Sequence, residues 1–200
     1  MPVNLKKELK FNLTKDNPGL NNLLVGLGWN VSSYDSETSF DLDAEVFMLG
    51  ENGKCPTDNE LVFYGNLVHE SGSVKHLGDN TTGEGDGDDE RIQIDLRKIP
   101  ANISRIIFTV TIYEAEKRGQ NFGQISNAFL QVSNAYIRVV NDETNKELLK
   151  YDLGDSFSID SALVVSELYR NGEEWEFKAI GTGFQGGLEA LCDHYGIAYK

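Results

Sequence analysis

The sequence predicts an all-β fold, a β-sandwich of two antiparallel sheets with a short C-terminal helix. Three observations lead to this prediction. Apolar and polar residues alternate with a period of two in most of the readable segments. Turn-forming residues separate these short segments from one another. Only one segment has clear helical periodicity, whereas a parallel sheet needs a crossover helix between each pair of strands.

The first two predicted strands lie in the N-terminal quarter of the chain. In residues 25–31, large apolar residues alternate with glycine and asparagine, which predicts a strand with one buried face. Residues 40–48 alternate more regularly. Their apolar side chains point to one face, and Asp41, Asp43 and Glu45 share the other.

Further strands are rich in β-branched or aromatic residues and adjoin turn-forming residues. They are expected at residues 91–96, 106–113 and 135–140. A hairpin is expected near the C-terminus, where residues 162–170 and 175–180 flank Asn171 and Gly172. Both of these turn residues tolerate a positive φ, so the pattern predicts a tight antiparallel turn.

The predicted helix is the last element of the chain. Leu188, Leu191, Cys192 and Tyr195 recur at helical spacing, and Gly196 follows where a left-handed residue would end the helix. We expect this helix to cover an edge or a face of one sheet.

One irregularity is a tandem heptad, in which residues 126–132 resemble residues 133–139. Matching residues of the two copies are seven positions apart, and side chains on a strand alternate between its two faces. On one continuous strand, the second copy would therefore face the opposite side of the sheet from the first. We therefore place the second copy on the strand and interpret the first as an absorbed insertion.

Length and composition indicate one soluble domain over residues 1–200. Hydrophobic residues make up 40% of the chain and charged residues 25%, as in folded globular proteins. Cys55 and Cys192 form no Cys-x-x-Cys pair, so we expect reduced, structural thiols. No segment reaches the ~20 apolar residues of a membrane span, and the first residues lack a secretory pattern. These features predict a cytoplasmic protein.

The net charge of −14 restricts the expected partners. Such a charge repels the phosphates of nucleic acids and the surface of anionic lipids unless a cation lies between them. Direct binding to nucleic acid is therefore not expected, and cations are the partners to look for.

The most acidic segment, residues 79–90, contains six carboxylates, three glycines and no basic residue. Carboxylates this dense repel one another unless a multivalent cation joins them. Glycines let the backbone fold back so that the about six to eight oxygens of a Ca²⁺ shell can converge. The segment is not an EF-hand, because Glu84 occupies the sixth position, where that loop needs glycine. The alternative is a solvated acidic linker.

Asp41 and Asp43 form a second candidate group for calcium. Their side chains project from one strand face ~6.5–7 Å apart, a separation that a cation can bridge. The alternative for this pair is a solvent-facing acidic stripe.

Several motifs together resemble the TerD family of tellurite-resistance and stress-response proteins. They are Val25-Gly26-Leu27-Gly28-Trp29, Phe40-Asp41-Leu42-Asp43-Ala44, Gly78-Asp79-Asn80, Thr82-Gly83-Glu84-Gly85-Asp86-Gly87-Asp88-Asp89-Glu90, Phe122-Gly123-Gln124, Gly181-Thr182-Gly183-Phe184 and Gly186-Gly187-Leu188. The resemblance runs from about residue 20 to 198, and the sequence departs from it at the tandem heptad. It implies a cytoplasmic, non-enzymatic, calcium-binding β-sandwich that works with membrane and soluble partners encoded beside it.

The resemblance and the charge argument together define the expected site. We expect two calcium ions, held by residues from the acidic segment and from the strand. The expected metal-site residues are Asp41, Asp43, Asp79, Asn80, Thr82, Gly83, Glu84, Gly85, Asp86, Asp88, Asp89 and Glu90.

Two functions remain open. The first is a calcium-responsive interaction module whose ordered loop presents a surface to protein partners of the tellurite-resistance system at the inner membrane. The second is a calcium-bridged binding domain for a phospholipid headgroup or a sugar, which needs an open coordination position. Catalysis is not expected, because His69, His76 and His194 have no neighbouring residue in the sequence that marks a nucleophile or a zinc site.

Overall fold

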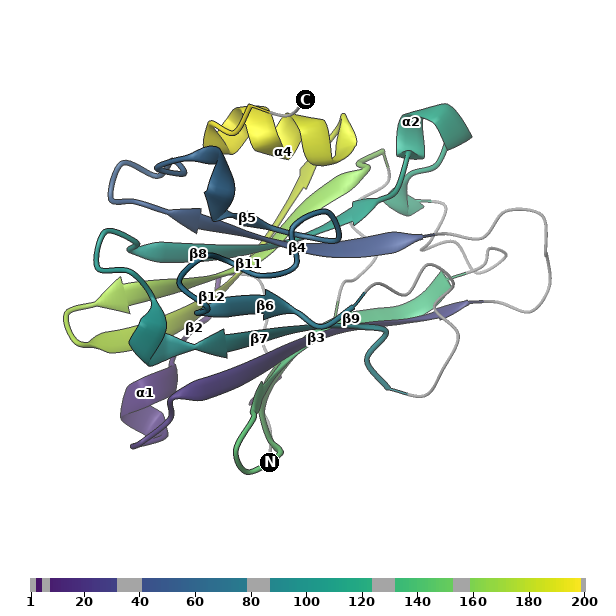
Figure 1. Ribbon diagram of the computed structural model, residues 1–200. Coiled ribbons are helices and arrows are strands. Elements are labelled where there is room, and N and C mark those ends of the chain that lie inside the picture. The colour runs from purple at the N-terminus through teal and green to yellow at the C-terminus, as the bar shows by residue number, and fades with distance from the viewer. Residues whose placement is uncertain are drawn as a thin grey trace.

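Two six-stranded sheets pack face to face, and one helix lies on the outside of one of them (Figure 1). The computed structural model describes residues 3–4, 8–31, 41–78, 87–123, 132–152 and 159–198. Strand, sheet and helix counts here refer to these residues. The predicted β-sandwich with a short C-terminal helix is confirmed.

Sheet A, the lower sheet in Figure 1, has the strand order β1-β10-β9-β3-β7-β6. Its strands are β1 (Val3–Asn4), β10 (Lys146–Asp152), β9 (Val132–Asn141), β3 (Asn22–Val31), β7 (Glu90–Asp95) and β6 (Val74–His76). Neighbouring strands are antiparallel except at one edge, where β1 pairs with β10 in parallel.

Sheet B has the order β2-β12-β11-β8-β4-β5, and its neighbouring strands are antiparallel. Its strands are β2 (Lys10–Asn12), β12 (Glu174–Phe184), β11 (Ala162–Asn171), β8 (Arg105–Ile112), β4 (Leu42–Leu49) and β5 (Leu61–Val62). The helices are α1 (Leu13–Asp16), α2 (Ala115–Arg118), α4 (Gly187–Tyr195) and two 3-10 turns, Asp58–Glu60 and Leu96–Lys98. Among the described helices, none is long and apolar enough to cross a bilayer.

The main core fills the space between the sheets. The alternating apolar residues predicted for two strands point into it, as expected for a period of two. They are Leu23, Val25, Leu27 and Trp29 of β3 and Leu42, Ala44, Val46 and Met48 of β4.

A second core lies between α4 and the outer face of sheet B. Leu191, Cys192 and Tyr195 of the helix pack there against strand residues that include Phe47 and Ile107. Gly196 ends the helix in the left-handed region, at φ +83°, as the sequence predicts. Since Phe47 and Leu49 face this second core, β4 is buried on both faces.

The hairpin turn, the tandem heptad and the two cysteines can be compared with the sequence predictions. The hairpin turn lies one residue later than expected, because Asn171 pairs with Glu174 and the loop consists of residues 172–173. The second heptad copy lies within β9, as predicted, whereas residues 126–131 of the first copy lie outside the described residues. Cys55 and Cys192 are buried free thiols. The single-domain prediction for residues 1–200 stays a prediction.

Candidate metal centre

The three acids at the start of β4 are buried. Asp41, Asp43 and Glu45 are 7%, 3% and 0% exposed, so the alternative of a solvent-facing acidic stripe is wrong. The reason is tertiary: this strand face belongs to the outer face of sheet B, where Phe47 and Leu49 of the same strand pack in the second core with α4. Burying carboxylates requires hydrogen bonds, counter-charges or protonation.

Glu45 is held by two threonines of the neighbouring strand. The hydroxyls of Thr109 and Thr111 donate to its two carboxylate oxygens at 2.6 and 2.5 Å. Burial raises the pKa of Glu45 to about 8, the hydroxyl hydrogen bonds oppose that rise, and the charge of Glu90 adds to it. Burial is therefore the main reason for the raised pKa of Glu45, and the charge of Glu90 makes a smaller contribution.

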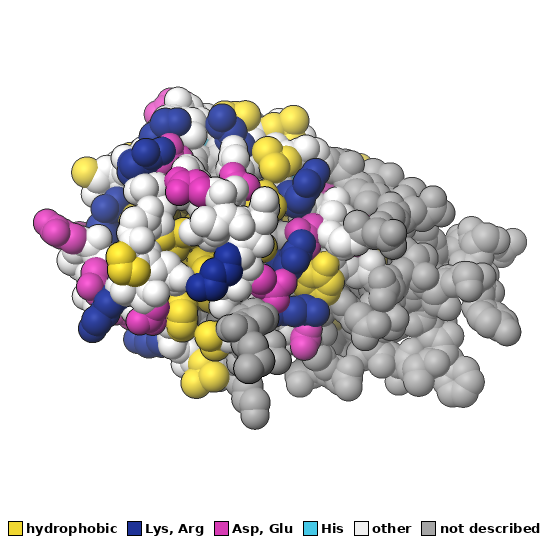
Figure 2. All heavy atoms as spheres, turned by 90° about the horizontal axis from the view of Figure 1, so that it is seen from below, with side chains coloured by type: hydrophobic (Ala, Val, Ile, Leu, Met, Phe, Trp, Pro, Cys, Tyr) yellow, Lys and Arg dark blue, Asp and Glu magenta, His cyan; other side chains and the backbone are white. Residues whose placement is uncertain are grey.

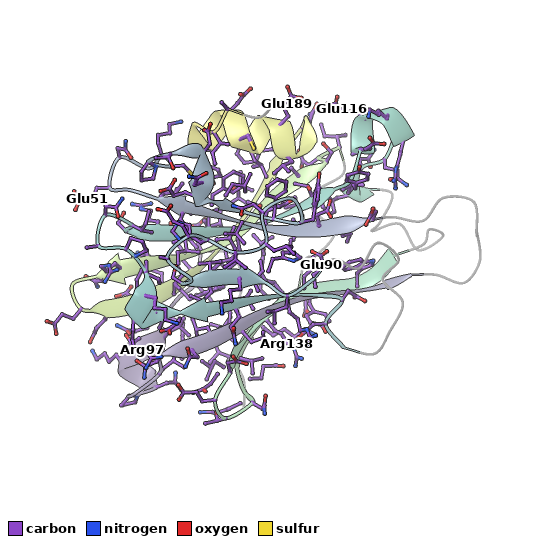
Figure 3. All side chains as sticks on the ribbon, in the orientation of Figure 1. Glu51, Glu90, Arg97, Glu116, Arg138 and Glu189 are labelled. Atoms are coloured by element: carbon purple, nitrogen blue, oxygen red, sulfur yellow. The ribbon has the colours of Figure 1, made fainter. Side chains whose placement is uncertain are left out.

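Glu90, the last residue of the acidic segment, reaches across from sheet A to β4. Its Oε2 accepts a hydrogen bond from the backbone N–H of Ala44 at 2.5 Å. The short strand β5 pairs with β4 only at Val46 and Phe47, so this pairing does not extend to Ala44. Glu90 is 1% exposed, and Figure 3 shows it in the space between the two sheets. The end of the acidic segment thus meets β4 between Asp43 and Glu45.

His76 is a neighbour of this site that the sequence analysis did not find. Its Nε2 lies 3.4 Å from Oε2 of Glu90, and both side chains are buried. The contact arises from the pairing of β6 with β7, which places His76 opposite Ile92, and this register follows from the tertiary structure.

Asp89 connects the acidic segment to β3. Its Oδ2 accepts a hydrogen bond from the Trp29 N–H at 2.8 Å, and its own N–H donates to the Leu27 carbonyl at 2.8 Å. Burial is the main cause that raises the pKa of this carboxyl. Asp89 therefore continues the β3–β7 pairing by one more residue.

Asp88 points in another direction, toward the outer face of sheet A. Its carboxylate forms an ion pair with Arg138 of β9, with 2.7 Å between Nε and Oδ1. The three consecutive acids 88–90 thus diverge: one lies on the outer face of sheet A, one at the end of β3, and one between the sheets.

The other predicted ligands, Asp79, Asn80, Thr82, Gly83, Glu84, Gly85 and Asp86, lie outside the described residues. Within the described ranges, no group of three or more His, Cys, Asp or Glu side chains has the arrangement of a metal site. The donor chemistry nevertheless fits calcium, because Asp41 and Asp43 offer carboxylate oxygens in a buried corner next to Glu45 and Glu90. Two aspartates supply only part of the about six to eight oxygens of a calcium shell.

A cavity of about 290 Å³ adjoins Asp43 on the outer face of sheet B. Its other lining residues are Tyr64, residues 111–117, which include part of α2, and residues 186–189 at the start of α4. Figure 3 shows two of its acidic residues, Glu116 and Glu189, on the facing elements α2 and α4. The cavity is therefore acidic as well as close to the candidate site.

Comparisons with known proteins identify what the chain is similar to. The family described as the TerD domain matches residues 1–195. The chain is 50% identical over 197 residues to General stress protein 16U of Bacillus subtilis, covering 98% of each. It is 47% identical to the Tellurium resistance protein TerD of Serratia marcescens, again covering 98% of each over 197 residues.

A solved structure shares the fold. It is the crystal structure of a homologue of telluride resistance protein TerD from Streptomyces coelicolor, with a TM-score of 0.68 and 22% identity. The similarity covers 86% of this chain and 95% of that one. At this identity the likeness supports the sandwich architecture alone.

Proposed function

The chain belongs to the TerD family, a family of resistance and stress proteins, and from this membership we propose that it is a calcium-binding, non-enzymatic interaction module of a tellurite-resistance and stress-response system. In this proposal two calcium ions order the acidic segment, and the ordered segment presents a surface to protein partners. The partners are proteins of the same system at the inner membrane, and the module works on the cytoplasmic side.

The observation that carries the proposal is the contact between Glu90 and the Ala44 N–H. It joins two acidic groups that lie more than 30 residues apart in the sequence. Carboxylates that are brought together in a buried place repel one another, and the charge of Glu90 contributes to the raised pKa of Glu45. An acidic segment that ends in this corner therefore favours a bound cation.

The residues of the chain have distinct roles in this proposal. Asp43 would offer carboxylate oxygens from the buried strand β4, and Asp41 would do so from the position directly before it. Acidic and glycine residues of the segment 79–86 would supply the remaining side-chain and carbonyl oxygens. When bound, Ca²⁺ would neutralise and cross-link these groups. Glu90 would hold the end of the segment against β4 through its hydrogen bond to Ala44.

The cavity beside Asp43 favours a second candidate, a calcium-bridged ligand-binding domain, because a ligand could there reach a coordination position left open on the metal. Glu116 and Glu189 in its wall would repel an anionic phospholipid headgroup, whereas Glu114 is paired with Lys117, which also lines the cavity. A neutral sugar would not meet this repulsion. Calcium-dependent flotation with anionic vesicles, or calcium-dependent retention on a sugar matrix, would favour this candidate over the interaction module.

Thermal unfolding with added metal tests calcium binding. Micromolar Ca²⁺ should raise the Tm, whereas the same concentration of Mg²⁺ should do little, because Mg²⁺ requires a small octahedral shell and sheds water reluctantly. At a free concentration ~100-fold above the Kd, each independent site adds ~2.7 kcal/mol to the free energy of unfolding. Equal responses to the two ions, or no response to calcium, would contradict the proposal.

A further inference from the structure

The Asp88 carboxylate is enclosed on the outer face of sheet A. Only 3% of its side chain is exposed. Oδ1 accepts hydrogen bonds from Nε of Arg138 at 2.7 Å and from the Tyr136 hydroxyl at 3.1 Å. Oδ2 accepts one from Nη2 of Arg138 at 2.9 Å. Both carboxylate oxygens are thus engaged, and the guanidinium binds them in the bidentate geometry that suits arginine.

Two glycines of β3 create the space for this arrangement. A Cβ atom at Gly26 would lie 2.2–2.6 Å from the three carboxylate atoms of Asp88. A Cβ atom at Gly28 would lie 2.5 Å from the Tyr136 ring. The register explains both contacts, since Gly26 is opposite Arg138 and Gly28 is opposite Tyr136. The alternating glycines of β3 therefore form the floor under Asp88 and its partner Tyr136.

Arg138 is itself fixed on the sheet and keeps its charge. Its Nη1 lies 3.1 Å from Oε2 of Glu147 on the adjacent strand β10. The hydrogen bond to Asp88 is the main cause that raises the pKa of Arg138. Burial, followed by the charge of Asp88, raises the pKa of Tyr136 to about 12, so its hydroxyl stays a neutral donor. Figure 3 shows Arg138 on the side of sheet A away from Glu90.

We propose that Asp88 is not a calcium ligand but a latch: Arg138 holds it on the outer face of sheet A and so positions Asp89 and Glu90 at the candidate metal centre. To bind a metal, Asp88 would have to give up a bidentate ion pair in which its own carboxylate is buried and the Arg138 side chain is partly exposed, which is unfavourable. The guanidinium would also repel a divalent cation. Arg138 is thus a positioning residue, and only its effect on calcium rests on the proposed function.

Hydrogen exchange of the Ala44 amide tests the latch without calcium. Arg138→Gln and Asp88→Asn should each speed this exchange at least ~10-fold relative to the Leu168 amide, because Glu90 loses its fixed position opposite the Ala44 N–H. Arg105→Gln is the matched control, because it removes an arginine that pairs with Glu167 on sheet B. Its Ala44 exchange should match that of the wild type. Unchanged exchange in both latch variants would overturn the proposal.

Calcium titration distinguishes a latch from a ligand by whether each variant raises or lowers the calcium Kd. If Asp88 is a latch, both variants should raise the calcium Kd by ~10-fold, and the double variant should be no weaker than the worse single one. If Asp88 is a ligand, Asp88→Asn should raise the Kd while Arg138→Gln lowers it, since a repelling cation has been removed. A raised Kd in Asp88→Asn together with a lowered Kd in Arg138→Gln would overturn the proposal, and so would an unchanged Kd in both variants. A wild type that binds no calcium would refute the proposed function, and the exchange measurement would still test the latch.

Discussion

Asp43 in β4 and Asp41 directly before it show how the environment of a residue determines its chemistry. Asp41 and Asp43 are almost fully buried, and Glu45 follows on the same strand face with a raised pKa. Burial makes a charged carboxylate costly, and neighbouring negative charges add to that cost. A strand face of this kind is better suited to holding a cation than to facing water.

Neutralising either aspartate should weaken calcium binding. Asp41→Asn or Asp43→Asn should raise the calcium Kd at least ~10-fold, about 1.4 kcal/mol, because each removes an anionic ligand. In calcium-free buffer the same changes should leave the free energy of unfolding unchanged or slightly higher, because they relieve repulsion. Calorimetric titration and urea unfolding measure the two effects.

Glu173→Gln provides the control for this pair, since Glu173 is exposed in the β11–β12 loop. It should change neither the Kd nor the stability. If both asparagine variants bind calcium like the wild type while Asp86→Asn does not, the acidic segment binds calcium alone.

At the scale of elements, α4 protects the acidic side of sheet B. Leu191 and Cys192 are 0% exposed, and the Tyr195 ring lies 4.8 Å from that of Phe47 on β4. The same strand therefore carries the candidate metal residues at one end and the packing partners of the helix at the other. Loosening α4 should expose this face of β4.

Leu191→Ala tests how much the helix contributes. The variant should lower the free energy of unfolding by about 2–5 kcal/mol, the usual range for a buried leucine with the cavity that its loss leaves. Urea unfolding measures the change. Glu189→Ala on the exposed side of the same helix should alter stability by less than ~0.5 kcal/mol. Equal effects of the two variants would mean that α4 is not packed as described.

For the whole molecule, the excess of negative charge is the dominant property. Figure 2 shows the outer face of sheet A, where lysine and arginine side chains alternate with acidic and apolar ones rather than forming a stripe. Two arginines of the described residues are paired with acids, Arg138 with Asp88 and Arg97 with Asp95. The visible cations therefore do not create a continuous basic surface on this face.

The protein should not retard duplex DNA in a gel at physiological salt. A net charge of −14 opposes the phosphate array, and nucleic-acid binding normally needs clustered lysine and arginine. Parallel lanes with calcium serve as the control for metal bridging. Salt-dependent retardation in the calcium-free lanes would contradict the prediction.

The sequence by itself determined the local features of this protein. The period-two pattern of residues 40–48 identified the two faces of β4, and the spacing from Leu188 to Tyr195 with Gly196 identified α4 and its end. The density of acids marked residues 79–90 and the β4 aspartates as metal candidates. These inferences succeed because backbone periodicity, capping and charge repulsion depend on residues close together in the chain.

Only the tertiary structure decided which of these features meet. It brought Glu90 to Ala44, placed His76 beside Glu90, and sent Asp88 to Arg138. It also buried the acidic face of β4, which the sequence alone allowed to face water. Each of these outcomes depends on sheet order and on the register between distant strands. A residue pattern with a period of two specifies the face of a strand but not its neighbour.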